Sequence, residues 1–165
     1  MWNIKYLDNC FDKIVSQKIK GDIFENICRD ILLLLHLESE IYGFSVNKNP
    51  PEKLLLYMGY EFKQDLGVDL IQVWEENDEY IKIHAIQCKY RKNKQYVFNF
   101  GNISTFLSCS KFLMKSVNKL IIMSTTKKLC RILRGKCELI GYEYLNSIKF
   151  DTFKIICDKY IHNYS

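Results

Sequence analysis

Apolar residues recur at every third or fourth position in several stretches of the chain, which is the spacing of an amphipathic helix. The clearest stretch predicts a helix over Asp22–Leu37. Asp22 and Glu25 have the spacing of a capping box at its start, and Gly21 separates it from the preceding segment. Three further helices are expected, over Ile4–Lys18, Asn102–Lys115 and, with a basic composition, Lys127–Leu133.

Strands are predicted in the middle of the chain. Apolar and polar residues alternate over Tyr80–Lys89, and the apolar run Leu70–Trp74 precedes them across a polar turn at 75–79. Because strand side chains repeat every two residues, Gln87 and Lys89 extend the apolar face of the second strand. Shorter strands are expected at Lys119–Ser124 and Cys137–Ile140. Strands that alternate with helices predict a mixed α/β sandwich.

The symmetry of this hairpin predicts which residues face each other. If the chain turns near Asp78, the numbers of facing residues add up to about 156. Asp69 then faces Gln87, with Cβ atoms about 5 Å apart. Lys89 projects beside Gln87 on the same face, so a carboxylate, a side-chain amide and an ammonium converge at one end of the sheet.

This combination has the chemistry of a magnesium site. Mg²⁺ prefers oxygen ligands, and three are at hand in the Asp69 carboxylate, the Gln87 amide oxygen and the Cys88 backbone carbonyl. Lys89 is placed to orient or deprotonate an attacking water and to stabilise charge on a phosphate.

The order and spacing of these residues resemble a known family. Gly67-Val-Asp69 followed by Gln87-Cys-Lys89, with Phe24-Glu25 in an earlier helix, is similar to the Mrr-like branch of the PD-(D/E)XK restriction endonucleases. The segments Lys119–Thr125 and Leu139–Leu145 add to a likeness that spans about Gly21–Leu145. The chain also resembles nuclease-like modules at the N-terminus of large phage and giant-virus helicases.

The resemblance implies an α/β fold, a three-layer α/β/α sandwich with a mixed central sheet. It also implies a Mg²⁺-dependent DNA endonuclease, with Mn²⁺ as a substitute. Asp69 matches the metal-binding aspartate, Gln87 the second metal-site position and Lys89 the catalytic lysine. Glu25 matches a helix glutamate that helps to hold the metal through water, although it could serve only as the capping partner of Asp22. Gln87 departs from the acidic residue of most branches, which favours chemistry with a single metal ion.

Charge is unevenly distributed along the chain. Residues 80–137 contain 13 of the 24 Lys and Arg residues and none of the 19 Asp and Glu residues. Such a segment favours a polyanionic partner such as nucleic acid. The family resemblance implies that this partner is DNA, with RNA as the alternative. Contacts to backbone phosphates are expected from Tyr90, Arg91, Lys92, Lys94, Lys127, Lys128, Arg131 and Arg134.

Other features of the sequence bear on the cellular compartment and the domain organisation. The chain lacks an apolar run long enough to span a membrane, and its first residues do not resemble a signal peptide. Seven scattered cysteines without a Cys-x-x-Cys pair favour buried free thiols in a reducing compartment, the cytoplasm or nucleus, including that of a host cell. We expect one domain over residues 1–165, which could belong to a longer protein and act with a helicase.

Three alternatives to a DNA endonuclease remain open from the sequence. A Holliday-junction resolvase could use the same fold, and a non-catalytic module could bind nucleic acid without cutting it. A protein-interaction domain could instead bind an acidic partner through its basic segment. Double-strand cleavage would favour a homodimer because each site cuts one strand.

Overall fold

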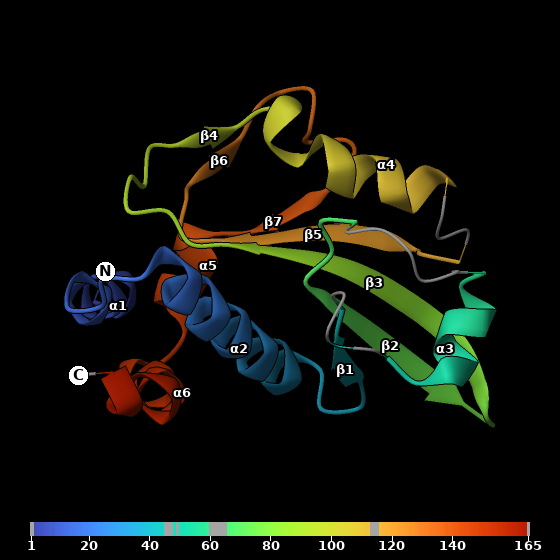
Figure 1. The fold of residues 1–165 in the computed structure, drawn as a ribbon, viewed down its shortest axis with the longest axis horizontal. Helices are drawn as coiled ribbons and strands as arrows, with labels where there is room; N and C mark the ends of the chain where they lie inside the picture. Colours follow the sequence, from blue (N-terminus) through green and yellow to red (C-terminus); the bar gives the residue numbers. More distant parts are fainter. Residues whose placement is uncertain (1, 45–47, 49, 60–65, 113–115, 165) are drawn as a thin grey trace.

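A long antiparallel hairpin forms the middle of the fold (Figure 1). The computed structural model describes residues 2–44, 48, 50–59, 66–112 and 116–164. The strands in these residues are β1 (Glu40–Gly43), β2 (Leu70–Glu76), β3 (Glu79–Lys89), β4 (Val97–Phe98), β5 (Lys119–Ser124), β6 (Lys128–Leu129) and β7 (Glu138–Ile140). The helices are α1 (Asn3–Asp12), α2 (Gln17–Leu35), α3 (Glu52–Tyr57), α4 (Ser104–Phe112), α5 (Tyr142–Ser147) and α6 (Phe150–Ile161), with short 3₁₀ helices at Gly101–Ile103 and His162–Tyr164.

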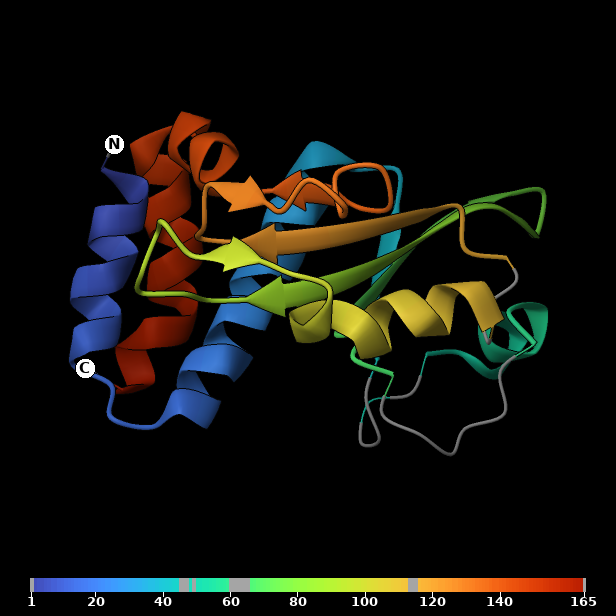
Figure 2. The ribbon, with the colours of Figure 1, turned by 90° about the horizontal axis from the view of Figure 1, so that it is seen from above.

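Within the described residues, five strands form one mixed sheet in the order β1-β2-β3-β5-β7 (Figure 2). β2 pairs antiparallel with both β1 and β3, whereas β5 pairs parallel with β3 and β7 pairs parallel with β5. A parallel neighbour requires a crossover. The connection from β3 to β5 supplies it with α4 and with β4, which pairs with β6 in a small second sheet.

The hairpin has the predicted register along most of its length. Leu70 pairs with Ile86 and Trp74 with Lys82, so facing numbers add up to 156, and a bulge after Trp74 shifts the last pairs by one. Asn77 and Asp78 both have positive φ, 51° and 63°, which is typical of a two-residue type I′ turn. The turn therefore has two residues and is shorter than the polar turn predicted over residues 75–79.

The sheet has a separate hydrophobic core on each face. Leu70, Ile86 and Met123 pack with α1, α2 and α6, which lie together on one side of the sheet. Ile83, Ala85 and other residues of the opposite face pack with α3, α4 and the β4–β6 ribbon. The predicted three-layer α/β/α arrangement with a mixed central sheet is confirmed.

The predicted boundary between the first two helices is wrong. α1 ends at Asp12, and α2 begins at Gln17 with Ser16 as its N-cap, whose hydroxyl accepts a hydrogen bond from the Ile19 amide at 3.3 Å. Gly21 lies inside α2, where it costs about 1 kcal/mol relative to alanine and is tolerated. Asp22 is thus not an N-cap, and Glu25 has no capping-box role.

The predicted basic helix over Lys127–Leu133 is also wrong. β6 pairs in parallel with β4, Lys128 with Val97 and Leu129 with Phe98, and turns follow it. Leu129 and Leu133 are buried in the same core as Phe98, so tertiary packing outweighs the helical spacing of the apolar residues. The helix expected over Asn102–Lys115 is found as a short 3₁₀ turn and α4, and its positions 113–115 lie outside the described residues.

Two further expectations concern the setting of the protein. None of the helices in the described residues is long and apolar enough to cross a membrane. Six of the cysteines are free thiols, as predicted: Cys10, Cys28, Cys88, Cys130, Cys137 and Cys157.

Candidate active site

Asp69 lies where β2 separates from β3. Its backbone amide donates to the Ile86 carbonyl at 2.9 Å, and its carboxylate Oδ2 accepts from the Cys88 amide at 2.6 Å. These two bonds bracket Gln87, so Asp69 faces Gln87 as the hairpin register predicts. The carboxylate takes the place of a backbone acceptor at this point of the ladder. Since the N–H and C=O of one strand residue point the same way, the Cys88 carbonyl faces the same neighbour.

Gln87 is held in a tight, buried position. Its side chain is 5% exposed, and a Cβ built on Gly67 would lie 3.2 Å from Gln87 Nε2 and 3.4 Å from the Phe106 amide nitrogen. Gly67 also has a φ of 64°, so a larger residue there would be strained as well as crowded. Within the described part of the chain, Gln87 Oε1 is buried without a hydrogen-bond partner. A buried acceptor in this state favours a bound cation or water.

Lys89 extends the face of Gln87 at the end of β3. Its side chain is half-buried, and its ammonium makes no hydrogen bond or ion pair with the described residues. Its backbone carbonyl accepts from Ser124 Oγ at 2.5 Å. Beyond it, Thr125 Oγ1 accepts from the Arg91 amide at 2.9 Å and donates to the Arg91 carbonyl at 2.7 Å. The backbone that carries Lys89 is therefore fixed to β5, while its cation is left unpaired in the described structure.

Glu25 approaches the same strand end from the other face of the sheet. Its side chain is 16% exposed and pairs with Lys48 Nζ at 2.6 Å. The pKa of the Cys88 thiol is raised well above its usual value by burial, by a hydrogen bond with Cys28, and by the Asp69 and Glu25 carboxylates. Glu25 and Asp69 thus both act on Cys88, whereas Gln87 lies near Phe106 of α4 and Lys89 shares the face of Gln87 along β3.

These groups fit a hard divalent cation, and together they carry only a small negative charge for such a site. The described residues contain no group of three or more His, Cys, Asp or Glu side chains placed to hold a metal. The donors that fit are oxygens instead: the Asp69 carboxylate, the unpaired Gln87 amide oxygen and the Cys88 carbonyl, with Glu25 nearby. Oxygen donors are the ligands of Mg²⁺, and two carboxylates at most imply modest affinity.

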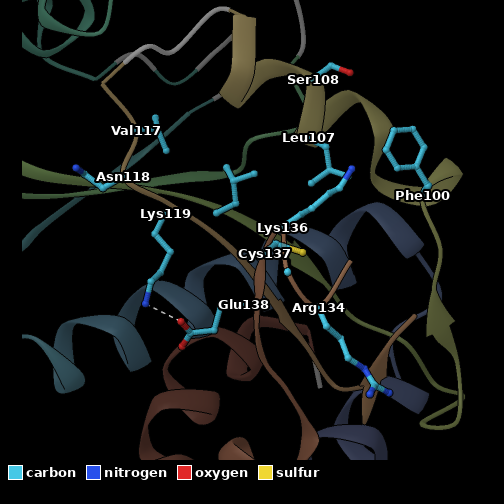
Figure 3. A pocket seen from close by; sticks show the side chains of 12 residues that line it. Phe100, Leu107, Ser108, Val117, Asn118, Lys119, Arg134, Lys136, Cys137 and Glu138 are labelled. Carbon is cyan, nitrogen blue, oxygen red and sulfur yellow. Dashed lines mark hydrogen bonds and ion pairs between the residues drawn. The ribbon is translucent and has the colours of Figure 1, made fainter. Parts of the chain in front are cut away.

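A cavity of about 910 Å³ lies away from these groups, between α4 and the starts of β5 and β7 (Figure 3). Asp69, Gln87 and Lys89 are not among its lining residues. The candidate site is therefore at the end of the sheet and separate from this cavity.

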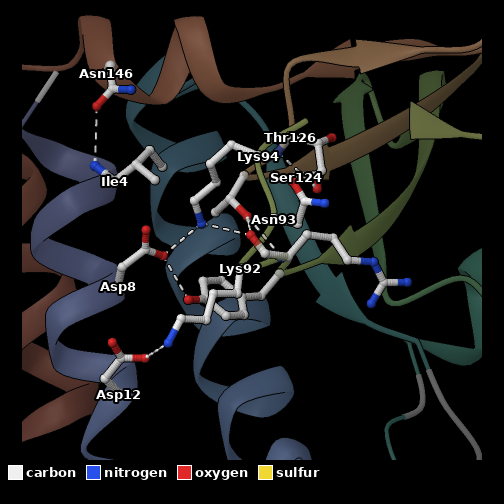
Figure 4. Close-up of polar contacts among 12 residues, drawn as sticks. Ile4, Asp8, Asp12, Lys92, Asn93, Lys94, Ser124, Thr126 and Asn146 are labelled. Carbon is white, nitrogen blue, oxygen red and sulfur yellow. Dashed lines mark hydrogen bonds and ion pairs between the residues drawn. The ribbon is translucent and has the colours of Figure 1, made fainter. Parts of the chain in front are cut away.

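The basic loop after β3 is bound to α1 (Figure 4). Asp8 Oδ1 accepts from the Tyr90 hydroxyl and from Lys94 Nζ, each at 2.7 Å. Asp12 pairs with Lys92 at 2.6 Å. Burial lowers the pKa of Lys94, with Asp8 opposing the effect. Three of the residues expected to contact phosphates thus have acidic or polar partners within the chain.

The other predicted phosphate contacts have no acidic partner among the described residues. The Arg91 guanidinium lies over the Tyr96 ring, 5.0 Å from its centroid. Lys127, Lys128 and Arg131 are exposed, just before β6, on it and in the turn after it. Sequence reasoning did not anticipate the acidic partners of the loop, because Asp8 and Asp12 are about 80 residues away along the chain.

Comparison with known families agrees with this geometry. The family model Mrr_cat_2, described as restriction endonuclease, matches residues 53–157. The matched region contains Asp69, Gln87 and Lys89, and it leaves Glu25 outside. A search of curated proteins gives no match. Because the match covers more than half of the chain and the mixed sheet is flanked by helices as such a fold requires, the chain belongs to the restriction endonuclease family, in the Mrr-like branch of the PD-(D/E)XK nucleases.

Proposed function

We propose that this protein is a metal-dependent endonuclease that hydrolyses DNA phosphodiester bonds. The observation that carries the proposal is the buried, unpartnered Gln87 Oε1, which lies across from the Asp69 carboxylate in a chain of this family. Such an acceptor is costly to leave unpaired, and a bound Mg²⁺ would satisfy it. Mn²⁺ is the expected substitute.

Each residue of the site has a distinct task in this proposal. Asp69, Gln87 and the Cys88 carbonyl would hold the metal, with Glu25 acting through water once it exchanges its bond to Lys48. Bound there, the ion would lower the pKa of a coordinated water and offset charge on the phosphate. Lys89 orients the attacking water and stabilises the charge that develops on the phosphoryl oxygens. The bonds from Ser124 and Thr125 keep this lysine in place.

The basic surface supplies the binding energy for the DNA backbone. Lys127, Lys128 and Arg131 are exposed and bind phosphates in this proposal, and Arg91 joins them from the end of β3. Lys92 and Lys94 reach phosphates only by leaving Asp12 and Asp8. We further propose that double-strand cleavage requires two copies of the chain, and that a helicase acts on the same DNA.

Cleavage of supercoiled plasmid and of linear single strands tests the proposal. The protein is incubated with Mg²⁺, Mn²⁺ or EDTA beside Asp69→Ala and Lys89→Ala, and far-ultraviolet circular dichroism verifies that both variants fold. We expect nicking or linearisation that needs the metal and is lost in both variants. A matched control, Lys149→Gln, removes an exposed cation of the α6 N-terminus and should cut normally.

The other outcomes assign different roles. Binding without cutting in all three proteins would replace the endonuclease with a non-catalytic binding module, which the loss of an acidic residue at Gln87 makes the second candidate. Cutting that survives in both variants would show that the site lies elsewhere.

A further inference from the structure

The cavity beside β7 combines an apolar floor with an exposed aromatic ring (Figure 3). Leu107 of α4 and Val117, Leu120 and Cys137 from the sheet side form the floor. Burial raises the pKa of the Cys137 thiol to about 11, so this wall is uncharged at neutral pH. Phe100 forms one side and is 49% exposed. A ring of this size left half in water beside an apolar recess is suited to stack on a flat ligand.

The rim of this cavity is positively charged. Lys136 lies over the Phe100 ring, 5.6 Å from its centroid. Arg134 precedes it by two residues, and its side chain extends away from Lys136 and Phe100 (Figure 3), with its Nε donating to the Leu129 carbonyl at 3.4 Å. Glu138 is the acidic residue of the lining, and Lys119 pairs with it at 2.7 Å. Arg134 and Lys136 therefore give the rim an excess of two positive charges. They belong to the same segment, residues 127–136, as the exposed Lys127, Lys128 and Arg131.

The cavity lies farther along the sheet than the candidate active site. Leu120, on its lining, pairs with Ala85, two positions before Gln87 and four before Lys89 along β3. At about 3.3 Å per residue this is roughly 7–13 Å, or about two to four base-pair steps of B-DNA. A group bound in the cavity is thus not at the bond that is cut, but it lies within reach of the same DNA.

We propose that this cavity binds a nucleotide, with the unstacked base against Phe100 and the apolar floor and the phosphate at Lys136. The combination of a stacking ring, an apolar recess and an adjacent cation matches the two parts of a nucleotide. The ligand is a free nucleotide or a nucleotide displaced from a DNA strand, and the two share this chemistry. In taking nucleic acid as the partner, the inference rests on the proposed function.

Titrations followed by amide NMR test this site directly. Asp69→Ala in EDTA is titrated with deoxyadenosine monophosphate, deoxyadenosine and inorganic phosphate, so that the result does not depend on cleavage. We expect the monophosphate to shift the amides of Leu107, Val117 and Cys137. Phe100→Leu should weaken its binding about tenfold, the size of one stacking contact. Lys136→Gln should reduce its affinity to that of the nucleoside.

Two matched control variants and a second ligand distinguish a free nucleotide from a nucleotide displaced from a DNA strand. Phe150→Leu and Lys149→Gln remove a partly exposed ring and a cation from α6 and its N-terminus, and should leave binding unchanged. A duplex with one unpaired nucleotide that binds more tightly than a paired duplex, with the difference lost in Phe100→Leu, would identify a displaced base. Equal binding of both duplexes, with the monophosphate response retained, would identify a free nucleotide.

Two results would overturn the inference. One is that millimolar monophosphate leaves the cavity amides unshifted and Phe100→Leu binds both duplexes like the parent. The other is that inorganic phosphate shifts the same amides with the same affinity, which would leave an anion site without a base. A failed plasmid assay alone would not overturn this inference, because these titrations do not require cleavage.

Discussion

In the proposed metal site, the amide at position 87 determines how strongly the ion is held. Gln87 contributes a neutral oxygen where most branches of the superfamily have a carboxylate, and it lies across from Asp69. Gln87→Glu would add a charged ligand, and metal affinity rises with ligand charge. We expect the Mg²⁺ concentration for half-maximal cleavage to fall roughly tenfold, within the range known for groups around a metal. Initial rates over a Mg²⁺ titration measure it.

The same change should have a second, opposite effect without metal. A carboxylate buried close to Asp69 repels it and lowers stability. Gln87→Glu should therefore melt at a lower temperature than the parent in EDTA and recover in Mg²⁺. Gln87→Met keeps the volume and removes the oxygen, and it should show no such recovery. Equal melting of Gln87→Glu in EDTA and Mg²⁺ would contradict a metal at this position.

His84 provides a pH-dependent contribution to stability that is independent of the site. It is 7% exposed, lies against Trp74 with ring centroids 4.7 Å apart, and pairs with Gln72 across the hairpin. Burial, with the nearby charges of Lys82 and Lys119, lowers its pKa to about 4. Between the usual value near 6.5 and this value the unfolded chain binds a proton that the folded chain does not. Stability is therefore lost as pH falls through this window.

The size of this effect follows from linkage. From pH 7 to pH 5, His84 should reduce the free energy of unfolding by about 2 kcal/mol. Urea unfolding of the parent and of His84→Gln at both pH values measures it, since all other groups cancel in the comparison. A parent and variant that lose the same free energy between the two pH values would contradict the assignment.

At the scale of elements, the end of β3 is joined to β5 by a side chain. The backbone ladder ends with Lys89 opposite Ser124, and the Thr125 hydroxyl then bonds both the N–H and the C=O of Arg91. Thr125→Val keeps the shape and leaves the Arg91 N–H unpaired, at a cost of about 1–3 kcal/mol, whereas the Arg91 carbonyl still accepts from Lys94 Nζ. If Lys89 acts as proposed, the loosened strand end should also reduce kcat.

The conservative variant separates the two effects. Thr125→Ser retains the hydroxyl and should restore cleavage close to that of the parent, even if its lost methyl lowers stability. Denaturant unfolding and steady-state cleavage of the three proteins provide the measurements. Full activity in Thr125→Val would show that this junction does not position Lys89.

The helix and strand boundaries show what periodicity can predict. The β2–β3 register follows from the length of the hairpin and the position of its turn, so Asp69 and Gln87 could be placed together from the sequence. The start of α2 could not, because Ser16 and Asp22 are both good caps and the tertiary structure uses the first. β6 was mistaken for a helix because its two residues take their conformation from β4.

At the scale of the whole molecule, pairs of residues far apart in the chain account for the contacts that could not be predicted from the sequence. Lys48 pairs with Glu25, and Asp8 pairs with Tyr90 and Lys94. No local pattern signals such pairs, since each depends on how α1, α2 and the sheet pack. The consequence is that charge counted along the chain overstates the charge that can meet DNA: part of the basic segment is already paired with α1.

This division of the basic segment predicts how DNA binding should depend on salt. Each phosphate contact contributes about 0.9 to the slope of log affinity against log salt. Replacing Lys127, Lys128 and Arg131 with Gln should therefore lower the slope by about 3, measured by fluorescence anisotropy with a labelled duplex in EDTA. Lys94→Gln should leave the slope unchanged but reduce stability, because it strips the partly buried Asp8 of its ion pair.

A charge-matched control completes this test. Lys5, Lys13 and Lys149 are exposed on α1, at its end and before α6, and replacing all three with Gln removes the same net charge. If binding followed net charge alone, both triple variants would lose the same slope. A loss confined to the variant of β6 and its turn would place the DNA on the segment that contains Arg134 and Lys136, beside the proposed nucleotide cavity. An unchanged slope there, with a loss in Lys94→Gln, would instead mean that the loop leaves α1 to bind DNA.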